Sequence, residues 1–268
     1  MALPGRQFLR NLIHGRTLLF QLVQRDFRQR FIGSAAGWVW GLIQPLVMLA
    51  VWTFVFQICM KMSPPKGAVT DNYTLFLSAG YLPWMLFQES VMRSANSLIE
   101  NSNLITKTVF PSEIVAVAIF ISSLMSHLLA LVLLIAAIAI WGGGLTPMIA
   151  LLPVYMFLTG LLAVGVGWIF SSLQVYLRDT AQILTVVMTC WFWITPIFIG
   201  EELVPPGFRF LIRWNPLAGV VRAYRERLLS WRPPSMEDLL VLTAWSVAVF
   251  VCGGLFFRHL KRGFADVL

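Results

Sequence analysis

The sequence predicts an all-α integral membrane protein with six transmembrane helices, an N-terminal amphipathic helix in the membrane interface and an outer re-entrant hairpin between spans five and six. The clearest observation is that residues 114–177 contain no Asp, Glu, Lys or Arg and are interrupted near their middle by Gly142-Gly143-Gly144. A bilayer core about 30 Å thick requires roughly 20 apolar residues per helix, so this stretch accommodates two spans and a turn. Continuous apolar stretches without strict alternation favour helices over a β-barrel.

Composition is the second observation. The chain is 58% hydrophobic and only 12% charged, and its mean hydropathy is +0.78, which excludes an ordinary water-soluble protein. The net charge of +8 comes from basic residues clustered at both ends and in one loop, so lipid headgroups or a protein partner explain it better than nucleic acid. Cys59, Cys190 and Cys252 lie in apolar stretches without Cys-x-x-Cys pairing, so neither disulfides nor a metal site is predicted.

Residues 1–35 are predicted to form the cytoplasmic N-terminus and the interface helix. Leu19, Val23, Phe27 and Phe31 recur every four residues on one helical face, with arginines between them. This pattern is typical of a helix that lies in the headgroup region. The arginines interrupt the apolar residues too often for a cleavable signal peptide.

Residues 36–258 are predicted to form the transmembrane domain, and residues 259–268 a cytoplasmic tail. The spans are expected at residues 36–60, 73–97, 113–141, 148–173, 180–199 and 239–257. Span two contains Glu89 and Arg93, one helical turn apart, which predicts a mutual ion pair inside the bundle. Both ends of the chain are basic, which places both on the cytoplasmic side and requires an even number of spans.

Catalytic chemistry has one candidate. Ser123 and His127 share a face of span three, and a membrane hydrolase would use such a pair as nucleophile and base. Span three has no acidic residue to orient the imidazole, and no Gly-x-Ser-x-Gly elbow occurs. Hydrogen bonding between packed helices explains both residues at least as well, so no catalytic residue is predicted.

The chain also has no sequence signature of an energy source. No Gly-x-x-x-x-Gly-Lys-Ser/Thr motif occurs, so it cannot bind ATP through a P-loop. Glu89 is the only acid well inside a span, whereas ion-coupled transport relies on several buried acids. A transport activity would therefore draw its energy from another subunit.

Several motifs follow one another over nearly the whole chain. They are Arg25-Asp26-Phe27, Gly37-Trp38-Val39-Trp40, Gln44-Pro45-Leu46, Asn103-Leu104-Ile105, Phe110-Pro111, Tyr176-Leu177-Arg178-Asp179, Trp214-Asn215-Pro216-Leu217 and Phe264-Ala265-Asp266-Val267-Leu268. In order and spacing they resemble the permease subunit of type-2 ABC exporters for polysaccharides, most closely the exporters of lipid-linked O-antigen. Exporters of capsule and teichoic acid are relatives of that family.

The resemblance implies a homodimeric permease of the inner (cytoplasmic) membrane, bound to two copies of a separate ABC ATPase that holds ATP and Mg. The cargo would be a lipid-linked polysaccharide, with O-antigen expected and capsular polysaccharide or teichoic acid as alternatives. A membrane enzyme of glycan assembly would require metal-binding carboxylates, and no Asp-x-Asp occurs. No cofactor is expected in this chain.

In such exporters the loop between spans two and three docks on the ATPase. The resemblance assigns this role to Asn103, Leu104, Ile105, Lys107 and Phe110. An ordinary helix connector is the alternative. Apolar side chains in a cytoplasmic loop require cover, which favours docking.

Aromatic residues are the expected contacts of the polymer, because sugar C–H faces pack on aromatic planes. The family has aromatic-lined conduits near spans one and five, which makes Trp38, Trp52, Trp191 and Trp193 the candidates. Tryptophans also populate the interface belts of any membrane protein, and this alternative stays open for each of them.

Residues 201–238 are expected to form the outer hairpin. Pro205-Pro206-Gly207 introduces residues 208–220, which are too few and too often interrupted by arginine to span a bilayer. Three arginines follow, Arg222, Arg225 and Arg227. They are predicted either to gate the exit and bind phosphate on a lipid carrier or glycan, or to form a solvated charged face.

Overall fold

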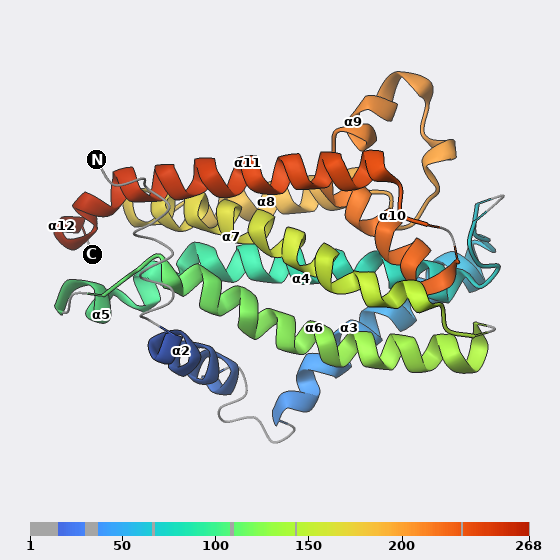
Figure 1. Cartoon of the computed structure of the whole chain (residues 1–268), viewed down its shortest axis with the longest axis horizontal. Coiled ribbons are helices and arrows are strands. Elements are labelled where there is room, and N and C mark those ends of the chain that lie inside the picture. The colour runs from blue at the N-terminus through green and yellow to red at the C-terminus, as the bar shows by residue number, and fades with distance from the viewer. Residues whose placement is uncertain are drawn as a thin grey trace.

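The computed structural model describes residues 16–29, 37–65, 68–107, 110–142, 144–231 and 233–267, and this part of the chain is helical without a β-strand. The long helices run side by side along the long axis of the molecule (Figure 1). The helices are α2 (Arg16–Gln29), η1 (Gly37–Val39), α3 (Trp40–Trp52), the π-helix η2 (Thr53–Cys59), α4 (Tyr73–Glu100), α5 (Ser102–Lys107), α6 (Ile114–Trp141), η3 (Pro147–Leu151), α7 (Leu152–Tyr176), α8 (Thr180–Ile194), η4 (Glu201–Leu203), η5 (Pro206–Phe208), α9 (Arg209–Arg213), α10 (Pro216–Leu229), α11 (Met236–Leu260), η6 (Lys261–Gly263) and α12 (Phe264–Val267).

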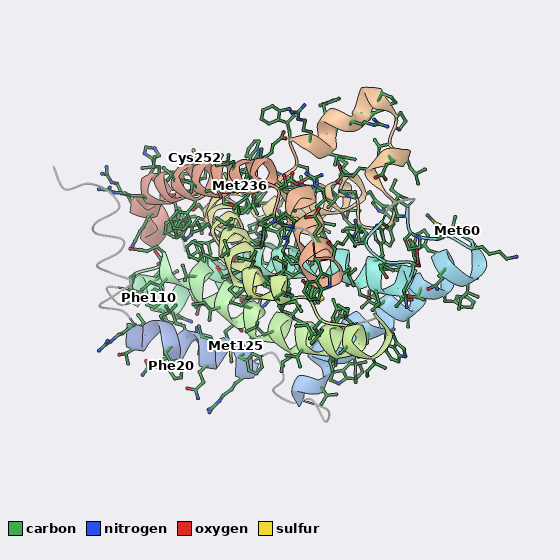
Figure 2. The ribbon with its side chains drawn as sticks, turned by 45° about the vertical axis from the view of Figure 1, so that its right-hand side comes forward. Phe20, Met60, Phe110, Met125, Met236 and Cys252 are labelled. Carbon is green, nitrogen blue, oxygen red and sulfur yellow. The ribbon has the colours of Figure 1, made fainter. Side chains whose placement is uncertain are left out.

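Three helical segments are long and apolar enough to cross a membrane: Ile114–Trp141, Pro147–Tyr176 and Met236–Gly263. Two shorter apolar helices cover Ile43–Cys59 and Thr180–Ile194. The surface of the bundle is rich in apolar side chains, such as Phe20, Met125 and Cys252, which are labelled in Figure 2. An apolar surface of this kind suits lipid contact rather than water. The prediction of an all-helical membrane fold is thereby confirmed.

Helix α4 lies at the centre of the bundle and packs against α6, α7, α8 and α10. Its buried side chains include Leu77, Trp84 and Phe87. Its serines are satisfied within the helix, because the hydroxyl groups of Ser90 and Ser94 donate to carbonyl oxygens four residues earlier, each at 2.7 Å. Most side chains of α4 are buried within the protein, so this helix can include polar residues without exposing them to lipid.

Helices α7 and α11 touch backbone to backbone. A Cβ atom at Gly253 would lie 2.3 Å from the carbonyl oxygen of Gly165, and one at Gly165 would lie 2.6 Å from the carbonyl oxygen of Val249. Only glycine at both positions allows this separation. The contact aligns the sixth predicted span with the fourth.

Helix α2 corresponds to the predicted interface helix, although residues 1–15 and 30–36 lie outside the described part. Leu22 and Val23 pack on Ile114 and Ala118 at the start of α6. Helices α2, α5 and α12 lie at one end of the molecule, and α9 lies toward the other (Figure 1). The chain therefore returns to the end at which α2 lies.

The predicted ion pair between Glu89 and Arg93 is present, but it is the longer of the two ion pairs that Arg93 makes. Arg93 Nη1 is 4.0 Å from Glu89 Oε1, whereas Arg93 Nη2 donates to Asp26 Oδ1 at 2.5 Å. Glu89 in turn accepts a hydrogen bond from Ser123 Oγ at 3.3 Å. Arg93 thus joins α4 chiefly to α2, a contact between distant segments that helix spacing alone could not reveal.

Candidate functional site

An aromatic cluster joins the first predicted span to α4 and to the C-terminal part of α8. Its members are Trp52, Phe56, Tyr81, Trp84, Phe87, Trp191, Phe192, Trp193 and Phe198. Neighbouring rings lie within the range of edge-to-face and offset contacts. The cluster contains three of the four predicted polymer-contact tryptophans, Trp52, Trp191 and Trp193.

Two of the predicted tryptophans meet at Phe198. The ring of Trp52 lies edge-on to Phe198 with centroids 5.0 Å apart, and it also meets Tyr81 at 4.6 Å. Trp193 stacks on Phe198 at 5.3 Å. Trp193 keeps 64% of its surface exposed, so it presents an open aromatic face.

Trp191 has a different environment. Its Nε1 donates to Asn215 Oδ1 at 2.9 Å, and its ring lies 5.2 Å from that of Phe87. Asn215 also caps α10, because its Oδ1 accepts from Leu217 N at 3.0 Å. Trp191 therefore ties α8 to the start of α10. The side chain of the fourth candidate, Trp38, lies outside the described part of the structure.

Sequence reasoning missed six members of the cluster, namely Tyr81, Trp84, Phe56, Phe87, Phe192 and Phe198. The sequence spacing could have indicated Tyr81 and Trp84, because residues three apart lie on one face of a helix. Trp84 Nε1 also donates to Gln88 Oε1, four residues later, at 2.8 Å. Phe198 follows the end of α8, where only the path of the loop brings it back to Trp52.

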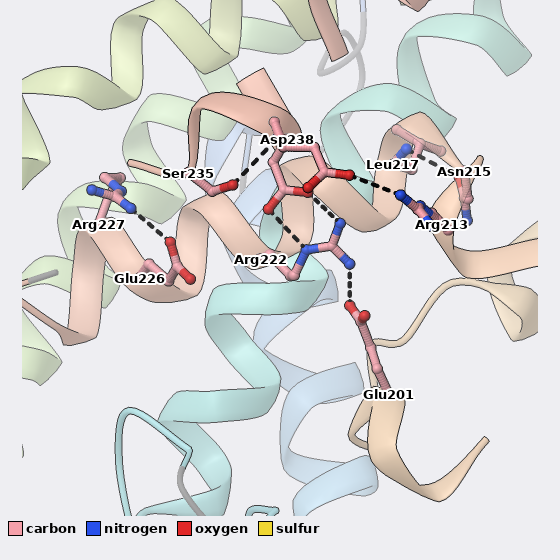
Figure 3. A network of polar contacts seen from close by, with 10 residues as sticks. Glu201, Arg213, Asn215, Leu217, Arg222, Glu226, Arg227, Ser235 and Asp238 are labelled. Atoms are coloured by element: carbon pink, nitrogen blue, oxygen red, sulfur yellow. Dashed lines mark hydrogen bonds and ion pairs between the residues drawn. The ribbon is translucent and has the colours of Figure 1, made fainter. Parts of the chain in front are cut away.

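The first of the three predicted gate arginines, Arg222, joins three elements within residues 201–238, the segment predicted to form the hairpin (Figure 3). Arg222 Nη2 and Nε donate to the two carboxylate oxygens of Asp238 at 2.6 and 3.2 Å, and Nη1 pairs with Glu201. Burial by itself would lower the pKa of Arg222, but the hydrogen bonds to Asp238 and Glu201 outweigh it and raise the pKa. The guanidinium therefore stays charged and links α10 to η4 and α11.

Arg225 is 7% exposed and has carbonyl partners. Its three nitrogens donate to the carbonyl oxygens of Phe76, Pro196 and Ile197 at 3.1, 2.8 and 2.6 Å. Its guanidinium carbon lies 3.6 Å from the centre of the Phe76 ring, which adds a cation–π contact. A Cβ atom at Gly80 would lie 2.6 Å from Nη2, so this glycine provides the space for the guanidinium.

Arg227 is fully buried and faces another part of the hairpin. Its Nη2 donates to Glu226 Oε2 at 2.6 Å and to the carbonyl oxygen of Pro233 at 3.2 Å. The three arginines therefore do not form one cluster, and their groups make hydrogen bonds within the chain. Their role in gating or in phosphate binding stays a prediction.

Beside Arg222 lies a cavity of about 620 Å³ between η4, α9, α10 and α11. Arg213 and Glu237 line it and form an exposed ion pair at 3.2 Å. Cations and carboxylates alternate around this cavity, so it is polar but has no excess of either charge.

The predicted ATPase-docking residues lie on α5 and just after it. Asn103 is exposed, Leu104 is half-buried, and the side chain of Lys107 lies outside the described part. Ile105 packs on the main core, and Phe110 packs on Leu22 and its neighbours. The chain itself thus partly covers two of the apolar side chains, which weakens the argument from exposure, while docking stays a prediction.

Ser123 and His127 each meet a polar partner on a different helix. Ser123 Oγ donates to Glu89 on α4, and His127 Nε2 lies 3.0 Å from Tyr224 OH on α10. Within the described ranges, no group of three or more His, Cys, Asp or Glu side chains is placed to hold a metal ion. These contacts are typical of hydrogen bonding between packed helices.

Comparison with known proteins shows a consistent set of relatives. The ABC-2 type transporter family matches residues 17–229. The chain is 28% identical over 254 residues to the O-antigen export system permease protein RfbA of Klebsiella pneumoniae, covering 94% of this chain and 95% of the relative. It is 26% identical over 262 residues to the protein of the same name in Myxococcus xanthus, covering 97% and 98%. The polysialic acid transport protein KpsM of Escherichia coli is 22% identical over 213 residues, covering 78% and 80%.

The matched family region contains the aromatic cluster, α5 and the three arginines of α10. The helical fold, the apolar spans and the relatives lead to the same conclusion: this chain belongs to the ABC-2 type transporter family.

Proposed function

We propose that this chain is the transmembrane subunit of an ATP-driven exporter that moves lipid-linked O-antigen polysaccharide across the inner membrane. The observation that carries the proposal is its similarity to O-antigen export permeases over 94% or more of its length. The chain would have no catalytic residue, and ATP and Mg would bind to a separate ABC ATPase present in two copies.

The membrane arrangement in this proposal has six spans: α3 continued by η2, then α4, α6, α7, α8 and α11. Both termini would be cytoplasmic, and the hairpin formed by α9 and α10 would be re-entrant on the outer face. The placement of α2 and α12 at one end of the molecule supports an even number of crossings between them (Figure 1). Helix α2 would lie in the cytoplasmic interface.

The polymer would pass through a conduit between two copies of this chain. Trp52 and Trp193, which meet at Phe198, supply half-buried and exposed aromatic faces on the first span and α8. Such faces pack on sugar rings without holding any one of them tightly. Trp38 belongs to the same proposed lining, whereas Trp191 would act as its anchor through Asn215.

Coupling to the ATPase would use α5. This helix contacts both α4 and α12, so a movement of α5 would reach the central helix of the bundle directly. At the outer end, the links from Arg222 to Asp238 and Glu201 would hold the hairpin in place until the conduit opens.

The test is transport into sealed vesicles that contain the chain together with its ABC ATPase. We expect ATP-dependent movement of lipid-linked O-antigen and none when the ATPase is omitted. Transport by the chain alone without ATP would contradict the proposal. A preference for capsular polymer would favour the second candidate, which the match to the polysialic acid transport protein supports over a smaller share of the chain.

A further inference from the structure

A cavity of about 320 Å³ lies between α2, α4 and α6, at the end of the molecule that also holds α5 and α12. It is separate from the aromatic cluster and from the cavity beside Arg222. Charged side chains from α2 and α4 form one part of its wall, namely Arg25, Asp26, Arg93 and Glu100. These four residues carry two positive and two negative charges.

Of the four charged side chains of this cavity, two form an ion pair with each other and the other two do not. Arg93 and Asp26 neutralise each other through their 2.5 Å contact. Arg25 donates to the side-chain oxygen of Asn101, a neutral amide. Within the described ranges, no carboxylate pairs with Arg25 and no cation pairs with Glu100, and both side chains are exposed. One cation and one anion therefore line the same cavity without contacting each other.

Apart from Asn96 and Asn101, the remaining wall of the cavity is apolar. Leu22 comes from α2, Met92 from α4, and Val115 and Ile119 from α6. Leu22 also belongs to the apolar cluster that holds α2 on α6. A wall that changes from charged to apolar matches the junction between a lipid headgroup and its chains, where amphipathic helices such as α2 bind.

We propose that this cavity binds the headgroup of a zwitterionic phospholipid, with its phosphate at Arg25 and its ammonium at Glu100. Arginine binds phosphate through charge-assisted hydrogen bonds, and a carboxylate accepts them from an ammonium group. A headgroup that carries both charges and is neutral overall can pair with Arg25 and with Glu100 at the same time. A pyrophosphate or another purely anionic headgroup would leave Glu100 unpaired and would be repelled by it.

This inference does not depend on the identity of the polymer, because it requires only that this end of the molecule meets a bilayer surface. The site would tie α2 to α4 through a lipid, beside the direct contact between Arg93 and Asp26.

The experiment measures lipid binding to the purified full-length chain by native mass spectrometry in detergent. The probes are phosphatidylethanolamine and phosphatidylglycerol with identical acyl chains, and a polyprenyl pyrophosphate. We expect phosphatidylethanolamine to bind about tenfold more tightly than either anionic lipid, which corresponds to one charge-assisted hydrogen bond. Arg25→Gln should weaken the binding of all three lipids, because each carries a phosphate, whereas Glu100→Gln should remove the preference for phosphatidylethanolamine.

The matched control is Arg28→Gln, because Arg28 is exposed on the same helix but does not line the cavity. It should bind phosphatidylethanolamine like the unchanged protein. The exchange of both charges, Arg25→Glu with Glu100→Arg, should restore binding that Arg25→Glu alone removes. Equal or tighter binding of an anionic lipid, or identical behaviour of Arg25→Gln and Arg28→Gln, would overturn the proposal.

Discussion

Arg225 shows how a charged side chain becomes part of a membrane protein core. Carbonyl oxygens from two separate segments accept its hydrogen bonds, and the face of Phe76 covers its plane. Two of these oxygens, those of Pro196 and Ile197, lie just beyond the end of α8, where no further helical turn supplies donors. The arginine therefore supplies hydrogen-bond donors to two carbonyl groups of the segment that follows the helix.

Replacing this arginine should be costly. Arg225→Ala would leave the carbonyl groups of Pro196 and Ile197 without their arginine donor and would remove the contact with Phe76, so we expect the free energy of unfolding to fall by about 3 kcal/mol or more. Thermal unfolding in detergent measures the loss. Arg213→Ala is the matched control, because its side chain is 76% exposed in an ion pair with Glu237, and its loss should stay below about 1 kcal/mol. Equal losses in the two variants would contradict this role for Arg225.

The sequence contained part of this information. Residues two apart on a helix do not face each other, so the spacing of Arg225 and Arg227 already argued against a single cluster. Nothing in the sequence identified Gly80 as the space for the guanidinium, because that contact joins α4 to a helix far along the chain. The charge of Arg225 alone predicted an exposed side chain, but its hydrogen bonds to backbone carbonyls allow the side chain to be buried.

At the scale of elements, α8 divides its tryptophans between two tasks. Trp191 faces Asn215 and the start of α10, whereas Trp193 faces outward beside Phe198. Their separation by two residues places them on different sides of the helix, as the spacing requires. One tryptophan serves the packing of the bundle, and the other is available to a ligand.

This division predicts different phenotypes for the two tryptophans. Trp193→Ala should leave the melting temperature nearly unchanged and should reduce polymer export while ATP hydrolysis by the complex continues. Trp191→Ala should lower the melting temperature, because it removes a hydrogen bond to Asn215 and the contact with Phe87. Export and thermal unfolding are measured on the same preparations. Normal export by Trp193→Ala would contradict its assignment to the conduit.

The close contact of α7 and α11 gives a second test at this scale. Gly253→Ala would place a Cβ atom 2.3 Å from the carbonyl oxygen of Gly165, so the two helices must separate and lose packing along their length. We expect a clear fall in melting temperature and in the yield of folded protein. Gly207→Ala is the control, because a Cβ atom there meets nothing within 4 Å, and it should be neutral.

The helices themselves were largely predictable from charge-free stretches. The third expected span, 113–141, agrees with α6, and the fourth agrees with η3 and α7 together. The fifth was expected to reach residue 199, but α8 ends at Ile194. Pro196 explains the difference, because proline lacks a backbone N–H and disfavours helical geometry in the residue before it. This shortened helix exposes the carbonyls that Arg225 binds.

For the whole molecule, the sequence predicted where the long helices lie along the chain but not which helices surround α4. The apolar residues of α5 illustrate the limit. Ile105 was expected to be covered by the ATPase, whereas it packs on the core of its own chain. Predicting what buries an apolar loop residue requires the tertiary arrangement, which one sequence does not provide.

Docking of the ATPase is therefore tested best at Asn103, which is exposed on α5. Asn103→Arg should reduce co-purification of the ATPase while the melting temperature of the permease stays the same. Leu104→Asp with Ile105→Asp should also abolish co-purification, but Ile105→Asp removes a core contact as well, so its melting temperature must be measured alongside. Full retention of a normally coupled ATPase by both variants would contradict docking at α5.

The central position of α4 has a consequence for biogenesis. Arg225 reaches Phe76 across 149 residues of sequence, so part of the environment of α4 does not exist until most of the chain has been synthesised. A segment that carries Glu89 and Arg93 enters lipid less readily than its apolar neighbours. Productive insertion of α4 thus depends on segments that leave the ribosome later, and a polypeptide truncated before α10 should be a ready substrate for membrane quality-control proteases.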